Sequence, residues 1–186
     1  MLTCRPITEP EHLAHLQRQP SASFLQTPAW GRVKSEWRRE SLGWFDDARP
    51  AGEQLVGSAL VLYRQVPKVK RYLAYLPEGP VIDWDADRLD DWLAPLTRHL
   101  KGQGAFGVRM GPPVVCRRWS AAQVKEGIAD DAVARLGDLP PTDRDPLGAR
   151  VVAQLTELGW QHRGAGEGGF AAGQPQYVFQ VPLADR

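Results

Sequence analysis

The segment from residue 24 to 37 constrains the fold of this chain more than any other stretch, because it combines a clear helix start with an aromatic face. Thr27 is a typical N-cap residue, and Pro28 at the first helical position is preset for helical geometry. The apolar positions that follow at a spacing of three to four are Trp30, Val33 and Trp37. This spacing predicts a buried stripe on a helix that packs against a sheet, with Lys34 adjacent to the stripe.

Further strand and helix signals surround this predicted helix. We expect strands at 2–7, 41–46, 55–65, 72–76, 105–110 and 176–182. We expect helices after Thr8, from about Asp85 to Gly102, after Ser120 and after Asp145, each of which has a capping or turn signal. The second to fourth strands form a natural antiparallel meander, and AFGVRM (105–110) reads as a short buried strand. The order predicts an α+β fold with a mixed, largely antiparallel sheet flanked by helices.

Length and composition favour one domain over residues 1–186, with a loop at 127–147 that is the stretch most similar to a linker. The 23 basic and 22 acidic residues nearly balance, so no global field attracts nucleic acid or a membrane.

Cys4 and Cys116 lack any metal-binding or CxxC spacing, which predicts two free thiols and no metal site. No apolar run reaches the length of a signal peptide or of a spanning helix, so we expect a cytoplasmic protein without membrane insertion.

Five blocks of sequence resemble the FemABX family, in the family's order. The first is FLQTPAWGRVKSEW at 24–37, and the others are ALVLYRQVP (59–67), LAYLPEGPVIDW (73–84), AFGVRMGPPV (105–114) and GQPQYVFQVPL (173–183). The resemblance implies an acetyltransferase-like fold of the GNAT type. Members of the family are typically built from two such halves, and this chain resembles the first half.

The resemblance also implies a function. Family members transfer amino acids from aminoacyl-tRNA to the peptide stem of a peptidoglycan precursor, with no cofactor beyond the tRNA. The implied partners are therefore a precursor linked to uridine diphosphate or to a lipid, an aminoacyl-tRNA, and a second acetyltransferase-like half in cis or in trans. Two alternatives stay open: a non-catalytic module that binds a muropeptide or a protein partner, and an acetyltransferase that uses coenzyme A. The last lacks the expected phosphate-binding loop, because PEGPVIDWDAD occupies that junction.

Four residues are candidates for substrate binding. Lys34 matches a family lysine implicated in binding the precursor diphosphate, and the alternative is a solvated lysine beside a core face. Tyr75 and Gly79 belong to the family signature Tyr-x-x-x-Gly-Pro, which marks the fold and can form a cleft wall. Arg109 lies on an apolar strand, where it must find a carboxylate or reach the strand end.

No general base can be assigned. The family pattern after the arginine is Arg-x-Asp-Pro, whereas this chain has Gly111 at the aspartate position. Catalytic residues therefore stay unknown, and surface or capping roles are expected for His12, His15, His99 and His162. Two locally basic stretches would bind phosphates only if they converge in space. They are Arg64, Lys68, Lys70 and Arg71, and Arg109, Arg117, Arg118 and Lys125.

Overall fold

A computed structural model describes residues 1–162 and 177–181 of the chain. Its strands are β1 (Leu2–Pro6), β2 (Arg38–Asp46), β3 (Leu55–Gln65), β4 (Tyr72–Leu76), β5 (Ala105–Met110), β6 (Arg117–Arg118) and β7 (Asp143–Arg144). Its helices are α1 (Glu9–Gln17), α2 (Pro28–Val33), α3 (Asp90–Gly102), α4 (Ala121–Ile128) and α5 (Pro146–Glu157), with 3-10 turns η1 (Phe24–Gln26) and η2 (Leu136–Asp138).

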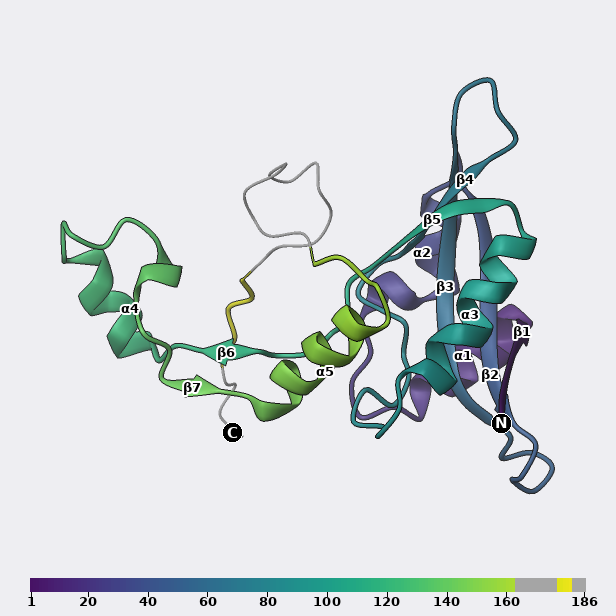
Figure 1. Cartoon of the computed structure of the whole chain (residues 1–186), viewed down its shortest axis with the longest axis horizontal. Coiled ribbons are helices and arrows are strands. Elements are labelled where there is room, and N and C mark those ends of the chain that lie inside the picture. The colour runs from purple at the N-terminus through teal and green to yellow at the C-terminus, as the bar shows by residue number, and fades with distance from the viewer. Residues whose placement is uncertain (163–176, 182–186) are drawn as a thin grey trace.

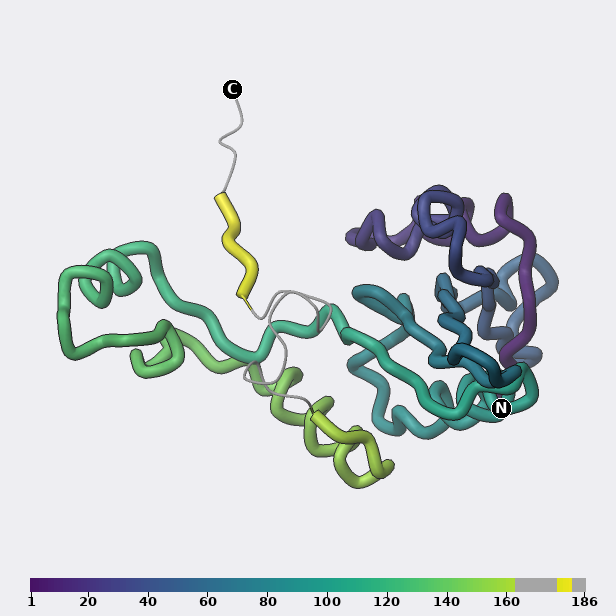
Figure 2. Tube along the Cα trace, turned by 90° about the horizontal axis from the view of Figure 1, so that it is seen from above, coloured from purple at the N-terminus to yellow at the C-terminus, as the bar shows by residue number. Residues whose placement is uncertain are grey.

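A five-stranded sheet in the order β1-β2-β3-β4-β5 forms the body of the molecule. The first three pairs are antiparallel and β4 pairs with β5 in parallel, with α3 as the crossover. Helices α1 and α2 cover one face and α3 the other (Figures 1 and 2). The predicted α+β class with a largely antiparallel sheet is confirmed.

The core lies between the sheet and α3. Its buried residues include Trp44, Tyr63 and Leu76 from the sheet and Leu93, Leu96 and Leu100 from α3. Alternation along each strand sends the residues between these core positions to the opposite face, under α1 and α2. That second face carries the candidate site.

An arm built from β6, β7, α4 and η2 projects away from the sheet (Figures 1 and 2). Ser120 caps α4 and Asp145 caps α5, as predicted. The predicted loop at 127–147 therefore contains η2 and β7. Arg117, Arg118 and Lys125 belong to this arm, so the two basic stretches of the sequence do not converge as a whole.

Four local predictions were wrong. Helix α2 ends at Val33, whose side chain is 66% exposed, because Lys34 leaves the helical conformation with ψ of 55°, and the predicted stripe therefore does not form. β5 is an edge strand with Phe106 60% exposed, so it is not fully buried. Helix α3 begins at Asp90 instead of near Asp85. The final strand is absent from 177–181, and residues 176 and 182 lie outside the described residues.

Two predicted surface histidines are buried. Helix α1 begins after Thr8, as expected, and the structure adds a capping box with Glu11. The helix turns His12, His15 and Leu16 toward the sheet and leaves Leu13 exposed. His12 Nδ1 lies 2.9 Å from Ser41 Oγ, and its Nε2 has no partner among the described residues. His99 is also largely shielded and contacts Glu40, with 3.2 Å between His99 Nε2 and the carboxylate.

Burial of these histidines predicts a pH-dependent stability. Burial lowers the pKa of His12 from 6.5 to about 4, with the nearby His15 adding to the effect, and burial also lowers the pKa of His15. The unfolded chain then binds protons more readily than the folded one, so stability is full above pH 6.5 and is lost as the pH falls toward 4. We expect His12 to account for a loss on the order of 3 kcal/mol over that range. Urea unfolding at pH 6.5 and at pH 4 measures this loss of stability.

Two variants distinguish the contribution of His12 from general acid denaturation. His12→Phe should flatten the pH dependence, whereas His162→Gln, which changes an exposed histidine, should leave it intact. Equal pH profiles in wild type and His12→Phe would show that His12 does not titrate as its burial requires.

Both cysteines are free, as predicted, with Cys4 half-buried and Cys116 exposed. In the part of the chain that the structure describes, no helix is long and apolar enough to cross a bilayer. No group of three or more His, Cys, Asp or Glu residues is arranged to hold a metal ion within the same residues.

Candidate substrate-binding site

Tyr75 and Arg109 are directly opposite each other on β4 and β5. Their neighbours on β4, Ala74 and Leu76, are fully buried in the core against α3, so Tyr75 and its partner face the α2 side of the sheet. Burial raises the pKa of the Tyr75 phenol, Arg109 works against the rise and Glu78 adds to it. The phenol therefore stays protonated at neutral pH and can donate a hydrogen bond.

Trp37 and Arg64 extend this pair into a cluster. The Trp37 ring lies with its centroid 6.3 Å from that of Tyr75, and the Arg64 guanidinium lies 5.7 Å from the centroid of the Trp37 ring. None of the ion pairs within the described residues involves Arg64 or Arg109. We call these four residues the arginine–aromatic cluster. It offers two guanidinium groups, a phenol and an indole face to an anionic ligand.

Gln26 fixes the turn that follows Tyr75. This side chain is fully buried, accepts a hydrogen bond from the backbone N–H of Leu60 at 2.9 Å and donates to the carbonyl of Pro77. Gly79 packs directly on the Gln26 amide, so that a Cβ at this position would overlap it. Ser23 also donates to Glu78, which has a positive φ of 45°. The structure thus gives Gly79 a role in holding the turn, and it is itself buried.

Lys34 stands at the C-terminal end of α2, beside this cluster in sequence. Its backbone carbonyl accepts a hydrogen bond from Trp37 N–H at 2.9 Å. Its ammonium lies 5.0 Å from the centroid of the Trp30 ring, and Trp30 in turn makes an edge contact with the exposed Phe24. Lys34 is therefore joined to the cluster through the short turn from Lys34 to Trp37, while its ammonium lies against Trp30.

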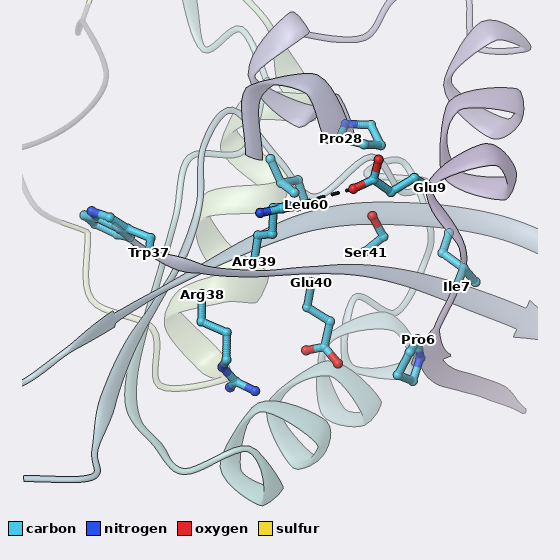
Figure 3. A pocket seen from close by; sticks show the side chains of 10 residues that line it. All are labelled: Pro6, Ile7, Glu9, Pro28, Trp37, Arg38, Arg39, Glu40, Ser41 and Leu60. Atoms are coloured by element: carbon cyan, nitrogen blue, oxygen red, sulfur yellow. Dashed lines mark ion pairs between the residues drawn. The ribbon is translucent and has the colours of Figure 1, made fainter. Parts of the chain in front are cut away.

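A depression along β2 leads toward the cluster (Figure 3). Glu9, Arg39 and Ser41 lie on its α1 and α2 side, whereas Arg38 and Glu40 leave β2 on the opposite side, toward α3 (Figure 3). Trp37 lines the far end of the depression and also contacts Tyr75. Glu9 pairs with Arg32 and, at 3.8 Å, with Arg39, and these exposed pairs add little stability.

Sequence reasoning identified Tyr75, Arg109 and Lys34 but missed Trp37 and Arg64 as their neighbours, and missed Gln26. Trp37 was expected in a helical stripe, and Arg64 only in a basic stretch. Glutamine is usually exposed, so the position of Gln26 had no signal in the sequence. Arg109, which was expected to find a carboxylate or to reach the strand end, makes no ion pair within residues 1–162 and 177–181.

Residues 7–186 match the sequence profile of the FemAB family, and the chain belongs to this family. Two similar relatives are lipid II:glycine glycyltransferases. One, from Staphylococcus saprophyticus, is 24% identical over 165 residues, which cover 87% of this chain and 32% of the relative. The other, from Staphylococcus aureus, is 26% identical over 155 residues, which cover 75% of this chain and 36% of the relative.

Among solved structures, FemX has a similar fold, with a TM-score of 0.57 and 21% identity over 87% of this chain and 32% of FemX. An acetyltransferase of Trypanosoma brucei is 14% identical, with a TM-score of 0.37 over 78% of this chain and 96% of that protein. The chain spans about a third of the length of the glycyltransferases and of FemX.

Proposed function

We propose that the chain is the N-terminal half of an aminoacyltransferase that adds amino acids from aminoacyl-tRNA to the peptide stem of a peptidoglycan precursor. An amine of the stem attacks the ester carbonyl of the aminoacyl-tRNA, so a C–N bond forms and the ester C–O bond breaks. The amine proton passes to the leaving oxygen, which yields an amide and free tRNA. Family membership and two relatives named lipid II:glycine glycyltransferase support this proposal.

The observation that carries the proposal is the arginine–aromatic cluster. Guanidinium groups bind phosphate oxygens in a bidentate manner, and a neutral phenol adds a further donor. Arg109, Tyr75 and Arg64 supply these groups on one face of the sheet, and Lys34, at the C-terminal end of α2, supplies a further point charge. The precursor diphosphate matches this set of donors, and the Trp37 ring is suited to stacking on a sugar or a uracil ring.

Lys34→Ala tests the predicted diphosphate contact. We expect this substitution to weaken binding of a uridine-diphosphate-linked muropeptide about tenfold, because one charge-assisted contact is lost. The melting temperature should stay unchanged, since Lys34 ends a helix and makes no ion pair within the described residues. Titration calorimetry measures the affinity, and Arg32→Ala, on the same helix but paired with Glu9, is the matched control. Equal affinities of wild type and Lys34→Ala would exclude the contact.

The proposed function includes a second acetyltransferase-like half, in cis or in trans. Val178, Phe179 and Val181 are between 74% and 81% exposed, so three apolar side chains within four residues are available for contact with such a half. The relatives are about three times as long as the matched region. A binding module without catalysis is the second candidate function, and the same exposed residues are what favour it. Transfer by the native polypeptide would distinguish the two.

A further inference from the structure

The end of the sheet where β3 turns into β4 is basic and carries no carboxylate of its own. The chain contains no Asp or Glu from 54 to 77 or from 92 to 125, although its overall charge is only +1. The β3–β4 loop projects beyond the sheet (Figure 1), and its exposed residues are Pro67, Lys68, Val69, Lys70 and Arg71. None of these cations takes part in an ion pair within the described residues.

The loop is joined in space to the edge of the sheet. The backbone N–H of Tyr72 donates to the carbonyl of Gly104 at 3.2 Å, which brings the loop next to the end of α3 and the start of β5. A depression there is lined by Arg71 from the loop, Thr97 and Lys101 from α3, and Phe106 from β5. We call Lys68, Val69, Lys70, Arg71, Lys101 and Phe106 the basic tip.

Apolar side chains alternate with the cations of the basic tip. Val69 stands between two lysines and is 50% exposed, and Phe106 is 60% exposed beside Arg71 and Lys101. The acidic residues at the start of β2 are Glu36, which is exposed, and Glu40, which is held by Tyr63 and His99. The tip is therefore a projecting surface that combines four cations with an aliphatic and an aromatic side chain.

We propose that the basic tip docks the protein on the surface of an anionic phospholipid bilayer. The four cations bind lipid phosphates, and Val69 and Phe106 enter the boundary between headgroups and acyl chains. RNA is the less suitable partner, because Phe106 is the one aromatic ring among the six residues of the basic tip, whereas single-stranded nucleic acids are bound by stacking successive bases on several aromatic side chains. The inference deepens the proposed function, since a lipid-linked acceptor would lie at such a surface, but vesicle binding does not require transfer activity.

Sedimentation with vesicles of phosphatidylglycerol and phosphatidylcholine, free of any precursor, tests the proposal. Each cation near an anionic surface contributes about a fivefold gain in partitioning, so Lys70→Gln, Arg71→Gln and Lys101→Gln together should weaken binding roughly 100-fold. The matched control removes the same charge elsewhere, through Arg49→Gln, Arg88→Gln and Lys125→Gln, and should change binding far less. Binding of the wild type should also decrease with added salt.

A second variant tests insertion of the apolar side chains. Val69→Ser with Phe106→Ser keeps every charge and should still reduce partitioning, most clearly at high salt, because both side chains are exposed in the free protein.

Equal losses in the two charge variants, or wild-type binding to neutral vesicles alone, would overturn the proposal. Loss of tRNA binding by the tip variant with unchanged vesicle binding would assign the surface to RNA instead. If vesicles bind as expected but no transfer occurs, only the proposed function fails.

Discussion

Gln26→Leu should lower the free energy of unfolding by about 3 kcal/mol, because each of two buried backbone groups loses its partner at a cost of roughly 1–3 kcal/mol. These groups are the Leu60 N–H and the Pro77 carbonyl. Leucine is apolar and of broadly similar size to glutamine, so the main change is the loss of the two hydrogen bonds. Urea denaturation at pH 7 measures the effect.

Gln19→Leu is the matched control for this prediction. Gln19 is only half-buried, and within the described residues its amide hydrogen-bonds to His15 alone, four residues earlier on the chain. Its substitution should cost less than 1 kcal/mol, in line with the small net value of a local hydrogen bond. Comparable losses in the two variants would mean that Gln26 does not anchor the turn at 77–79, and hence does not position the end of β4.

Arg109→Gln should reduce the affinity for a uridine-diphosphate-linked muropeptide by 10- to 100-fold, roughly the value of one charge-assisted hydrogen-bonded contact. Glutamine keeps a hydrogen-bond donor on a shorter side chain and removes the charge. Because Arg109 makes no ion pair within the described residues, its loss should leave the thermal unfolding midpoint within a few degrees of wild type. Titration calorimetry and a thermal scan on the same samples give both values.

Arg117→Gln provides the comparison for Arg109→Gln. Arg117 is an exposed arginine on β6, in the arm that projects from the sheet, and it contacts the Trp119 ring with 5.3 Å between its guanidinium carbon and the ring centroid. Arg117→Gln lowers the net charge by the same amount as Arg109→Gln but should barely change the affinity for the muropeptide. If both variants lose affinity to the same extent, binding reflects the general charge of the protein, and the assignment of Arg109 is wrong.

Local signals were enough to predict most of the fold. β3 and β4 have the predicted bounds, because each is a largely apolar run with turn residues on either side. The helix stripe failed because a spacing of three to four shows which residues share a face only while the helix continues, and α2 stops at Val33. The same spacing places His12, His15 and Leu16 on one face of α1. Their burial was not predicted, because the histidines were assumed to lie on the surface.

The candidate site depended on contacts that one sequence does not specify. Tyr75 meets Arg109 only because β4 and β5 are parallel and in one particular register, and register is set by the whole sheet. Gln26 reaches a turn 51 residues further along the chain, at Pro77. The family resemblance identified Tyr75 and Arg109 as candidates, and the structure adds Trp37 and Arg64 as the groups beside them.

Amino-acid transfer by the native polypeptide tests the proposed function most directly. The protein would be incubated with tRNA charged with labelled amino acids and with lipid-linked and uridine-diphosphate-linked precursors. The proposal predicts label in the precursor as an amide, which survives the mild base that cleaves the ester of aminoacyl-tRNA, and no label when the precursor is omitted. No transfer from any charged tRNA, together with saturable binding and turnover of acetyl coenzyme A, would contradict it.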